Sequence, residues 1–170
     1  DFDGINDYVF ANGVALTLNN ADNSSNLPLS VSVWVYPDES SNTLVFGFYK
    51  NNPSFLQGPS LWWLSSNTFR YYDESTNIPG PGLVFDSGAY DLNNWHHVVV
   101  TISYGGGGEL YVNGSSQGTF SGGYDQARLD KFSIGVDCDG SSGGTCADQY
   151  FTGKIDEVAV WNDNLTSAEV

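Results

Sequence analysis

The sequence predicts an all-β protein built as an antiparallel β-sandwich, and three observations carry this prediction. Short apolar or alternating runs recur along the chain, each bounded by Gly, Asn, Asp, Ser or Pro. Residues 29–36 alternate between Leu or Val on one face and Ser, Trp or Tyr on the other, which is the period of a strand. Almost no segment has helical spacing. Many short strands without intervening helices favour two packed antiparallel sheets.

The strands expected on this basis follow one another with turn residues between them. In chain order they are Tyr8–Phe10, Val14–Leu18, Leu29–Tyr36, Leu44–Tyr49, Leu61–Leu64, Phe69–Tyr72, Trp95–Ser103, Glu109–Val112, Phe132–Val136 and Ile155–Trp161. Gly105–Gly108 and the pair Asn113-Gly114 are expected to form hairpin turns. The stretch 76–94, which contains the sequence IPGPG, is expected to be irregular. Thr166 and Glu169 have the spacing of a capping box.

The charge of the chain limits its partners. The 20 Asp and Glu residues against 5 Lys and Arg give a formal net charge of -15. Binding to nucleic acids or anionic membranes requires clustered basic residues, which this chain lacks. No apolar run approaches the roughly 20 residues of a membrane-spanning helix. The partners that remain are neutral, cationic or bridged by metal ions, and the acidity itself indicates a capacity for metal ions.

The two cysteines are placed for a local disulfide. Cys138 and Cys146 lie on either side of a Gly/Ser loop. A zinc site would need further Cys or His nearby, whereas His96 and His97 are distant in sequence. Free thiols are the alternative. A disulfide indicates an oxidising compartment, so the protein is expected to be secreted or displayed on a cell surface.

Four segments of the chain carry a resemblance to a known family. They are FDGINDYVF at 2–10, LSVSVWVYP at 29–37, WHHVVVTIS at 95–103 with LYVNG at 110–114, and GKIDEVAVWNDNLTSAEV at 153–170. In this order they resemble the laminin-G-like branch of the concanavalin A-like lectin and glucanase superfamily. The resemblance implies a single jelly-roll domain over 1–170 whose first and last strands are adjacent. Because Met is absent even at position 1, the domain is expected to be excised from a larger extracellular protein.

The superfamily contains enzymes as well as lectins, adhesion modules and structural domains, so function must be argued from residues. Its laminarinase-like glucanases carry Glu-x-Asp-x-x-Glu on one strand face, where one carboxylate acts as nucleophile and another as acid. Asp156-Glu157 is the nearest match here, but adjacent strand residues are expected to point to opposite faces. The Arg, Gln-x-His and Tyr-Lys strands of the alginate-lyase-like members are missing too, with only Arg70 and Arg128 available. No catalytic residue is therefore assigned.

Several other aromatic and histidine side chains are expected to have packing roles. A catalytic histidine would need a nucleophile or carboxylate partner, and the sequence identifies none for His96 or His97. Trp95 is expected to share a strand face with His97, as part of the core or of the sheet surface. Trp34 and Trp161 are expected to pack in the same way, because sandwich interiors accept aromatic residues readily.

Calcium is the expected cofactor, because it binds carboxylates together with carbonyl oxygens and tolerates irregular geometry. The first candidate site joins the two ends of the chain. If the terminal strands pair as the resemblance implies, Asp3 and Asp156 could approach each other, with the carbonyl of Gly4 as a further ligand. Concanavalin A-like domains often hold a structural calcium near this junction. The alternative is that Asp156 only accepts hydrogen bonds from backbone amides of the first turn.

The second candidate calcium site lies in VDCDGSSGGTCADQY at 136–150, which looks like an insertion relative to the family. Asp137 and Asp139 alternate there, and Asp148 follows. A disulfide would close a loop of about nine residues and hold these carboxylates in place before an ion arrives. The alternative is an acidic, solvated surface loop.

A ligand-binding surface is expected in the aromatic-rich hairpin SLWWLSSNTFRYYDES at 60–75. Adjacent strand residues point to opposite faces, so one member of each aromatic pair is expected in the core and the other outside. The pairs are Trp62 with Trp63 and Tyr71 with Tyr72. The exposed members would form a platform for sugar stacking, and Arg70 could bind a carboxylate. The alternative is that the stretch 76–94 or a second sheet covers them.

The sequence therefore predicts a non-catalytic, calcium-dependent recognition or adhesion module, lectin-like in fold, that binds glycans at a loop rim. The first alternative is a calcium-dependent module of a large bacterial adhesin that binds a peptide or protein ligand on a cell surface. A structural spacer that uses calcium only for rigidity is a further alternative, and a polysaccharide-degrading enzyme is the least favoured. The module is expected to be monomeric within its larger chain, without nucleic acid or membrane insertion.

Overall fold

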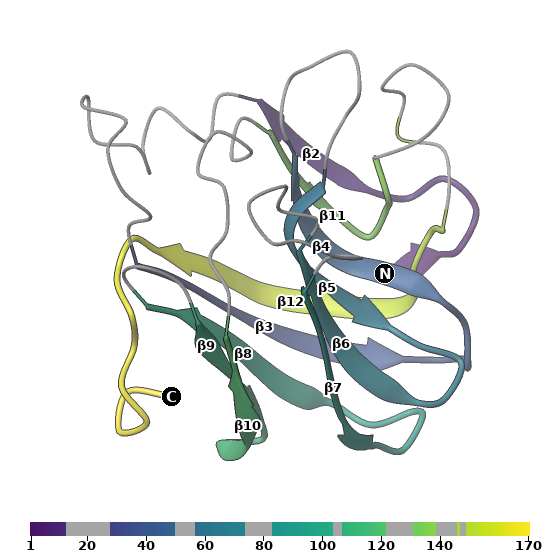
Figure 1. The fold of residues 1–170 in the computed structure, drawn as a ribbon. Coiled ribbons are helices and arrows are strands. Elements are labelled where there is room, and N and C mark those ends of the chain that lie inside the picture. Colours follow the sequence, from purple (N-terminus) through teal and green to yellow (C-terminus); the bar gives the residue numbers. More distant parts are fainter. Residues whose placement is uncertain are drawn as a thin grey trace.

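Residues 1–12, 28–49, 57–73, 83–103, 107–121, 131–138, 146 and 149–170 are described by the structure, a computed structural model. Over these ranges the chain forms twelve strands and no α-helix, arranged in two antiparallel sheets of six strands (Figure 1). The predicted all-β sandwich is therefore confirmed. Within the same ranges no helix is long and apolar enough to cross a membrane.

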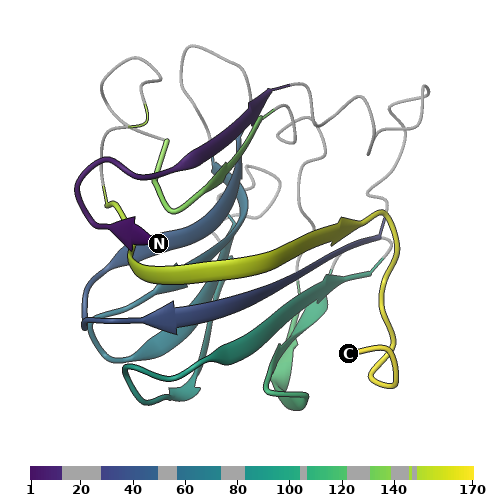
Figure 2. The ribbon, with the colours of Figure 1, turned by 180° about the vertical axis from the view of Figure 1, so that it is seen from behind.

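One sheet contains both the first and the last strand, and we call it the terminal sheet. In spatial order its strands are β1 (Phe2–Asp3), β12 (Thr152–Trp161), β3 (Leu29–Pro37), β8 (His96–Ile102), β9 (Gly108–Val112) and β10 (Ser115–Phe120). β1 pairs with β12, so the first and last strands are adjacent as the resemblance implied. Figure 2 shows β12, β3 and β8 side by side, with the N-terminus beside one end of β12.

The other sheet carries the hairpin with the paired tryptophans, and we call it the aromatic sheet. In spatial order its strands are β2 (Val9–Asn12), β11 (Lys131–Ile134), β4 (Thr43–Tyr49), β5 (Gln57–Trp63), β6 (Thr68–Asp73) and β7 (Leu83–Ala89). β11 lies between β2 and β4, which places the segment before Cys138 one strand in from the edge of this sheet.

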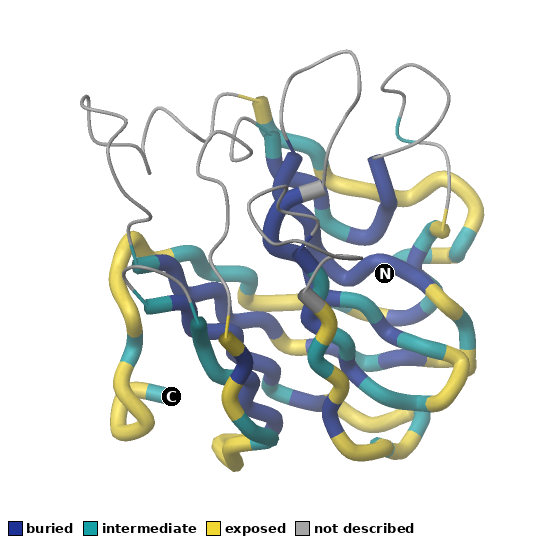
Figure 3. Tube along the Cα trace, in the orientation of Figure 1, coloured by how far each residue is buried: buried dark blue, intermediate teal, exposed yellow. Residues whose placement is uncertain are grey.

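The core lies between the two sheets, where the apolar faces of the strands meet (Figure 3). Val31, Val33 and Val35 of β3 are at most 2% exposed, while Trp34 between them is exposed. This is the predicted alternation for the second half of residues 29–36, whereas Ser30 and Ser32 in the first half are buried as well. Across the core, the ring of Tyr71 stacks on Phe120 of the opposite sheet with 4.3 Å between ring centroids. Burial of these apolar faces supplies the main stabilisation of the sandwich.

Two segments depart from the predicted strand pattern. Leu83–Ala89 lies within the stretch expected to be irregular, yet it forms β7 along the edge of the aromatic sheet. Phe85 packs against the core, and the hydroxyl of Ser87 accepts a hydrogen bond from the backbone N–H of Phe69. These tertiary contacts stabilise the strand although the neighbouring Pro and Gly residues favour irregular structure. The predicted strand Val14–Leu18 lies outside the described residues.

The predicted turns contain the expected local features. Asn113 and Gly114 both have positive φ angles, 53° and 72°, as a type I′ hairpin turn requires. The backbone N–H of Ser103 donates to the carbonyl of Gly107 at the base of the second predicted turn. At the end of the chain, the side chain of Glu169 accepts a hydrogen bond from the backbone N–H of Thr166, which is one of the two bonds of a capping box, and it accepts another from the Thr166 hydroxyl.

Candidate functional site

Each adjacent aromatic pair is divided between the core and the outer face of the aromatic sheet. Trp63 and Tyr71 are at most 1% exposed, whereas Trp62 and Tyr72 are half-buried. The indole N–H of Trp63 donates to the carbonyl of Glu39, so its one polar atom is satisfied within the protein. The prediction that one member of each pair lies in the core is confirmed, and the outer members are Trp62 and Tyr72.

The register between β5 and β6 brings the outer residues together. Trp62 lies directly opposite Arg70, and Ser60 lies opposite Tyr72. The indole N–H of Trp62 donates to the hydroxyl of Ser60 over 3.0 Å. That hydroxyl in turn donates to the backbone carbonyl of Tyr72 over 2.9 Å. These two bonds hold the indole of Trp62 in one orientation on the sheet surface.

A cavity of about 550 Å³ lies beside these residues, and we call it the aromatic-sheet cavity. Its volume is within the range of sites for small ligands. Its lining combines an indole, a phenol, a guanidinium, a carboxylate and several amides and hydroxyls. The lining residues are Asn42, Trp62, Leu64, Ser65, Ser66, Arg70, Tyr72, Asp137 and Gln149. Such a set can stack against the apolar face of a ligand and exchange hydrogen bonds with its polar groups.

Arg70 already has a carboxylate partner within the protein. Its Nε and Nη2 atoms lie 2.6 Å and 2.7 Å from the two carboxylate oxygens of Asp86 on β7. The hydrogen bond to Asp86 raises the pKa of the Arg70 guanidinium. A ligand carboxylate would therefore compete with Asp86 for the guanidinium of Arg70. The sequence did not predict this ion pair.

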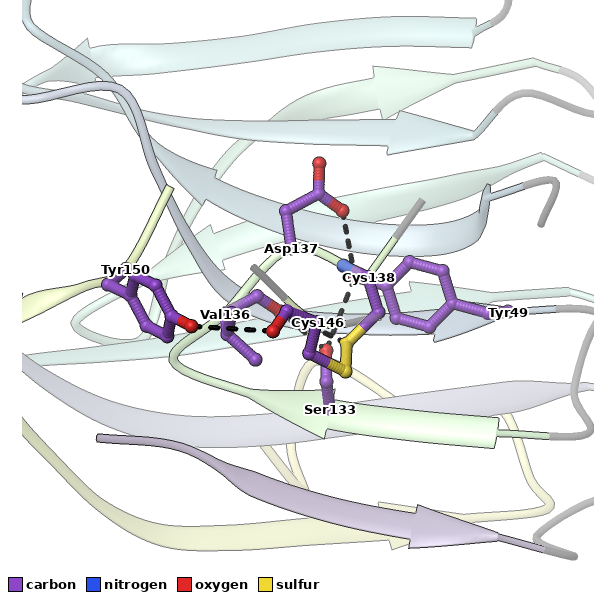
Figure 4. The surroundings of a disulfide bond; sticks show 7 residues. All are labelled: Tyr49, Ser133, Val136, Asp137, Cys138, Cys146 and Tyr150. Atoms are coloured by element: carbon purple, nitrogen blue, oxygen red, sulfur yellow. Dashed lines mark hydrogen bonds between the residues drawn. A yellow bond between two sulfur atoms is a disulfide. The ribbon is translucent and has the colours of Figure 1, made fainter. Parts of the chain in front are cut away.

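Asp137 reaches the cavity from the other side, at the start of the segment that contains the disulfide. It is 4% exposed, and the hydroxyl of Tyr49 donates to its Oδ1 atom over 3.1 Å (Figure 4). The Tyr49 oxygen also accepts hydrogen bonds from the backbone N–H of Cys138 and from the hydroxyl of Ser133, each at 3.2 Å. Burial, followed by the charge of Asp137, raises the pKa of Tyr49, so the phenol stays protonated.

The predicted disulfide between Cys138 and Cys146 is present and next to this network (Figure 4). The hydroxyl of Tyr150 donates to the carbonyl of Cys146 over 3.3 Å. Of the three acidic residues predicted to bind calcium in this segment, only Asp137 is described; Asp139 and Asp148 lie outside the described residues. Within the described ranges, no three His, Cys, Asp or Glu side chains converge on one point.

The register of the terminal strands does not bring the first predicted calcium ligands together. Asp3 pairs with Thr152, whereas Asp156 pairs with Trp34 on β3. Asp156 is four positions further along β12 than Thr152, which is about 13 Å along a strand. Asp3 accepts a hydrogen bond from the backbone N–H of Ile5 over 2.8 Å. The predicted approach of Asp3 to Asp156 is wrong, because β1 runs away from Asp156 along β12.

The remaining features of that predicted site are local. Gly4 has a φ of 76°, and its α-carbon packs so closely on the side chain of Thr152 that a Cβ atom would collide with it. One carboxylate oxygen of Asp156 accepts a hydrogen bond from the backbone N–H of its own neighbour, Glu157, over 2.8 Å, whereas the backbone N–H of Ile5 in the first turn donates to Asp3. Gly4 and Asp3 therefore shape the turn that follows β1.

A β-bulge in β12 changes the expected orientation of Asp156 and Glu157. The pairing with β3 shifts between Asp156 and Ala159, and Glu157 has a φ of 48°. Both carboxylates then line one cavity together with Trp34 and Trp95 on the outer face of the terminal sheet. The expectation that the two carboxylates point to opposite faces is wrong, because the alternation is interrupted at a bulge.

Other residues of the aromatic-sheet cavity had no signal in the sequence. Asn42 precedes β4, Ser65 and Ser66 belong to the turn between β5 and β6, and Gln149 precedes β12. They are ordinary turn residues in isolation. The sheet order β11-β4-β5-β6 brings them to the same end of the sandwich, and this order is a property of long-range pairing.

Comparisons with known proteins agree with this architecture. No curated protein is significantly similar in sequence to the chain. Among solved structures, the carbohydrate-binding module CBM40 of the Ruminococcus gnavus IT-sialidase, bound to α2,3-sialyllactose, is 15% identical. The match covers 86% of this chain and 82% of that one, with a TM-score of 0.68. A heptameric pentraxin from Limulus polyphemus is 19% identical over 85% of this chain and 69% of the pentraxin, with a TM-score of 0.60.

Domain 4 of an extracellular GH43 arabinanase from Geobacillus stearothermophilus, solved with arabinotriose, is 20% identical. That match covers 86% of this chain and 65% of the other, with a TM-score of 0.61. At these identities the similarity shows a common fold. The family model described as the concanavalin A-like lectin/glucanases superfamily matches residues 4–170, almost the whole sequence. The chain therefore belongs to the concanavalin A-like lectin/glucanase superfamily.

Proposed function

We propose that this chain is a non-catalytic, calcium-dependent glycan-binding module of a larger secreted or cell-surface protein, and that the aromatic-sheet cavity is its binding site. The observation that carries the proposal is the meeting of Trp62, Tyr72 and Asp137 at one cavity of about 550 Å³. Two carbohydrate-bound domains, from the R. gnavus sialidase and the G. stearothermophilus arabinanase, share the fold and support a glycan as the ligand class.

Trp62 supplies the stacking surface for a sugar ring. A pyranose or furanose presents C–H groups on one face, and a flat indole buries that face while the hydroxyls at the ring edge stay accessible. The hydrogen bond from the Trp62 indole to Ser60 fixes the orientation of the ring before the ligand arrives. A fixed aromatic side chain loses little conformational entropy on binding, which favours affinity.

Polar groups around the indole supply the hydrogen bonds to sugar hydroxyls. The side-chain amides of Asn42 and Gln149 each offer donors and an acceptor, and the hydroxyls of Ser65 and Ser66 offer both. Hydroxyls of a sugar need this mixed environment, because each one both donates and accepts. The arrangement suits a neutral glycan without any rearrangement of the ion pair between Arg70 and Asp86.

Calcium would bind at the edge of the same cavity, with Asp137 as one ligand and Asp139 and Asp148 as the others. A carboxylate that is almost fully buried and oriented by the Tyr49 hydroxyl supports this proposal, because a prearranged oxygen ligand lowers the cost of ion capture. When bound, the ion would supply a positive centre for vicinal sugar hydroxyls. The disulfide between Cys138 and Cys146 closes a short loop directly after Asp137.

The lining of the cavity favours binding over hydrolysis. Glycosidases of the common type need two carboxyl groups that flank the scissile bond. Among the described residues that line the aromatic-sheet cavity, Asp137 alone carries a carboxylate. We therefore assign no catalytic role to this cavity.

The test is binding to a glycan array that includes neutral oligosaccharides, α2,3-sialyllactose and arabinotriose, each with calcium and with a chelator. The best glycan is then titrated calorimetrically against Trp62→Ala. Loss of a central stacking residue is expected to weaken binding by roughly thirty-fold or more. Trp161→Ala is the matched control, because Trp161 is 38% exposed on the terminal sheet. Calcium is expected to be required for binding and to raise the melting temperature.

Two results would contradict the proposal. Equal affinity of Trp62→Ala and Trp161→Ala for the glycan would place the binding site elsewhere. Binding and melting curves that are the same in calcium and in chelator would contradict the calcium dependence. The glycan site would then be independent of calcium, and Asp137→Asn should weaken binding only slightly.

A further inference from the structure

A second cavity lies on the outer face of the terminal sheet, on the opposite side of the sandwich from the aromatic-sheet cavity. Its volume is about 390 Å³, and its lining residues are Trp34, Trp95, Asp156 and Glu157. We call it the terminal-sheet cavity. Two tryptophans and two carboxylates make up this lining, although the sequence predicted that both tryptophans were packing residues.

The tryptophans form aromatic walls that the neighbouring rings support. Trp34 and Trp95 are 36% and 42% exposed, which is unusual for the largest apolar side chains. The indole of Trp34 stacks on His97 with ring centroids 5.0 Å apart. Trp95 makes an edge contact with Tyr36 at 5.5 Å. Each indole is therefore supported on one side by another ring and is accessible from solvent on part of its surface.

The carboxylates reach this cavity because of the bulge in β12. Glu157 has a left-handed backbone conformation, with a φ of 48°, which is uncommon for a residue other than Gly, Asn or Asp. The bond from the Glu157 N–H to Asp156 closes the bulge. Bulges that redirect a side chain are frequent beside functional sites. Here the bulge places two negative charges beside two indoles on a solvent-facing sheet.

We propose that the terminal-sheet cavity binds an organic ammonium group. A cation is attracted to the face of an indole by its quadrupole, and adjacent carboxylates add a direct charge attraction. A neutral ligand would gain only the stacking, and an anion would be repelled by Asp156 and Glu157. The same sheet face already holds one contact of this kind, because the ammonium of Lys154 lies 5.2 Å from the centre of the Tyr36 ring.

The charge complementarity of the wider protein supports a cationic ligand. A chain with a net charge of -15 attracts cations over its whole surface, which raises their local concentration near the cavity. The cavity is large enough for a trimethylammonium group or for an amino sugar. Both carry the ammonium chemistry that the site recognises, as does the lysine side chain of a peptide, and the experiment separates the three.

The test uses choline and its uncharged carbon isostere, 3,3-dimethyl-1-butanol, which have the same shape at the branched end. Binding to the whole chain is followed by tryptophan fluorescence and by NMR shifts. Choline is expected to bind at least about tenfold more tightly than the isostere, because only choline carries the charge. The comparison is repeated for an amino sugar, with glucosamine as the charged and N-acetylglucosamine as the uncharged probe. For a peptide, tetralysine is the charged and tetra-acetyllysine the uncharged probe.

Variants then assign the binding to this cavity. Glu157→Gln and Trp95→Ala are each expected to weaken binding of the preferred cation by about tenfold. Asp38→Asn and Trp161→Ala are matched controls, because both residues are exposed and neither is among the described residues that line the cavity. Trp62→Ala, in the other sheet, should leave cation binding unchanged, which separates this inference from the proposed glycan site.

The wild-type comparison overturns the inference if all three ammonium probes bind no better than their uncharged counterparts. The inference is also overturned if Glu157→Gln and Asp38→Asn weaken cation binding equally, because the attraction would then come from the overall charge of the protein. Preference for any one ammonium probe, lost in Glu157→Gln and in Trp95→Ala, supports the inference and identifies the source of the cation.

Discussion

The phenolic hydroxyl of Tyr49 donates a hydrogen bond of 3.1 Å to a carboxylate oxygen of Asp137. Its oxygen accepts two further hydrogen bonds, from the backbone N–H of Cys138 and the hydroxyl of Ser133. One buried side chain at the end of β4 thus orients a carboxylate at the wall of the aromatic-sheet cavity and also the first cysteine of the disulfide. The same hydroxyl therefore connects the disulfide segment with the geometry of the proposed binding site.

Replacement of Tyr49 by Phe should lower the free energy of unfolding by about 1–3 kcal/mol, because polar groups that are buried around the phenol lose a partner. Chemical denaturation monitored by tryptophan fluorescence measures the change. Tyr8→Phe is the control, since Tyr8 is 47% exposed. If the two variants are equally stable, the hydrogen bonds around Tyr49 contribute no net stability.

Reduction of the Cys138–Cys146 disulfide should lower the free energy of unfolding by roughly 2–3 kcal/mol. The bond closes a short loop, and its loss increases the entropy of the unfolded chain. Denaturation curves with and without dithiothreitol give the difference. In a Cys138→Ala, Cys146→Ala double variant the reductant should have no effect. A shift in that variant as large as in the wild type would attribute the change to the reductant itself.

The sandwich could be predicted from the sequence because the patterns that specify its strands and turns are local. The alternation over residues 29–36 and the adjacent pairs Trp62-Trp63 and Tyr71-Tyr72 each determine which side of a strand is buried, whatever the neighbouring strands are. The residues of Asn113-Gly114 are sufficient to specify a tight turn. These features gave the correct fold class and the correct division of the aromatic pairs between core and surface.

The two candidate cavities could not be predicted to the same degree, because they depend on strand register and on departures from ideal strands. Arg70 meets Asp86 only because β7 pairs with β6, and the sequence around β7 indicates a loop. Asp3 and Asp156 are on adjacent strands as expected, but the register separates them. The bulge at Glu157 has no sequence signal such as Gly. Each of these outcomes is decided by contacts across the sheet.

The charge of Glu157 should be detectable at His97. Burial lowers the pKa of His97, and the negative charge of Glu157 partly offsets this effect by raising it. Glu157→Gln removes the raising contribution, so the pKa of His97 should fall further. An NMR titration of the imidazole carbons measures it, with His97→Gln for assignment and Asp38→Asn as the control. A pKa of His97 that rises in Glu157→Gln would contradict the contact.

The same titration predicts how stability depends on pH. The pKa of His97 in the folded protein lies below the ordinary histidine value of about 6.5, so the unfolded chain binds the proton more readily. The contribution of His97 to stability is therefore fully present above about pH 6.5 and is lost as the pH falls through the folded value. The acid-side decrease between these two values should be absent in His97→Gln. An unchanged decrease would assign it to other groups.

The ion pair between Arg70 and Asp86 should determine whether the aromatic-sheet cavity prefers neutral or acidic glycans. Asp86→Asn releases the Arg70 guanidinium from its carboxylate partner, so a ligand carboxylate can take that place in a bidentate contact. The ratio of affinities for α2,3-sialyllactose and lactose should therefore rise in Asp86→Asn. Calorimetric titration of the two sugars measures this ratio.

Stability should change little in that variant, by at most about 1 kcal/mol, because both side chains are more than a third exposed and solvent screens the pair. A shift in glycan preference without a shift in stability would separate recognition from folding. The double variant Arg70→Gln, Asp86→Asn tests the cause, because it lacks the released cation and should return the ratio to the wild-type value or below. If Asp86→Asn leaves the ratio unchanged, Arg70 does not contact the acidic group of the sugar, and selection in the cavity rests on Trp62 and its polar neighbours.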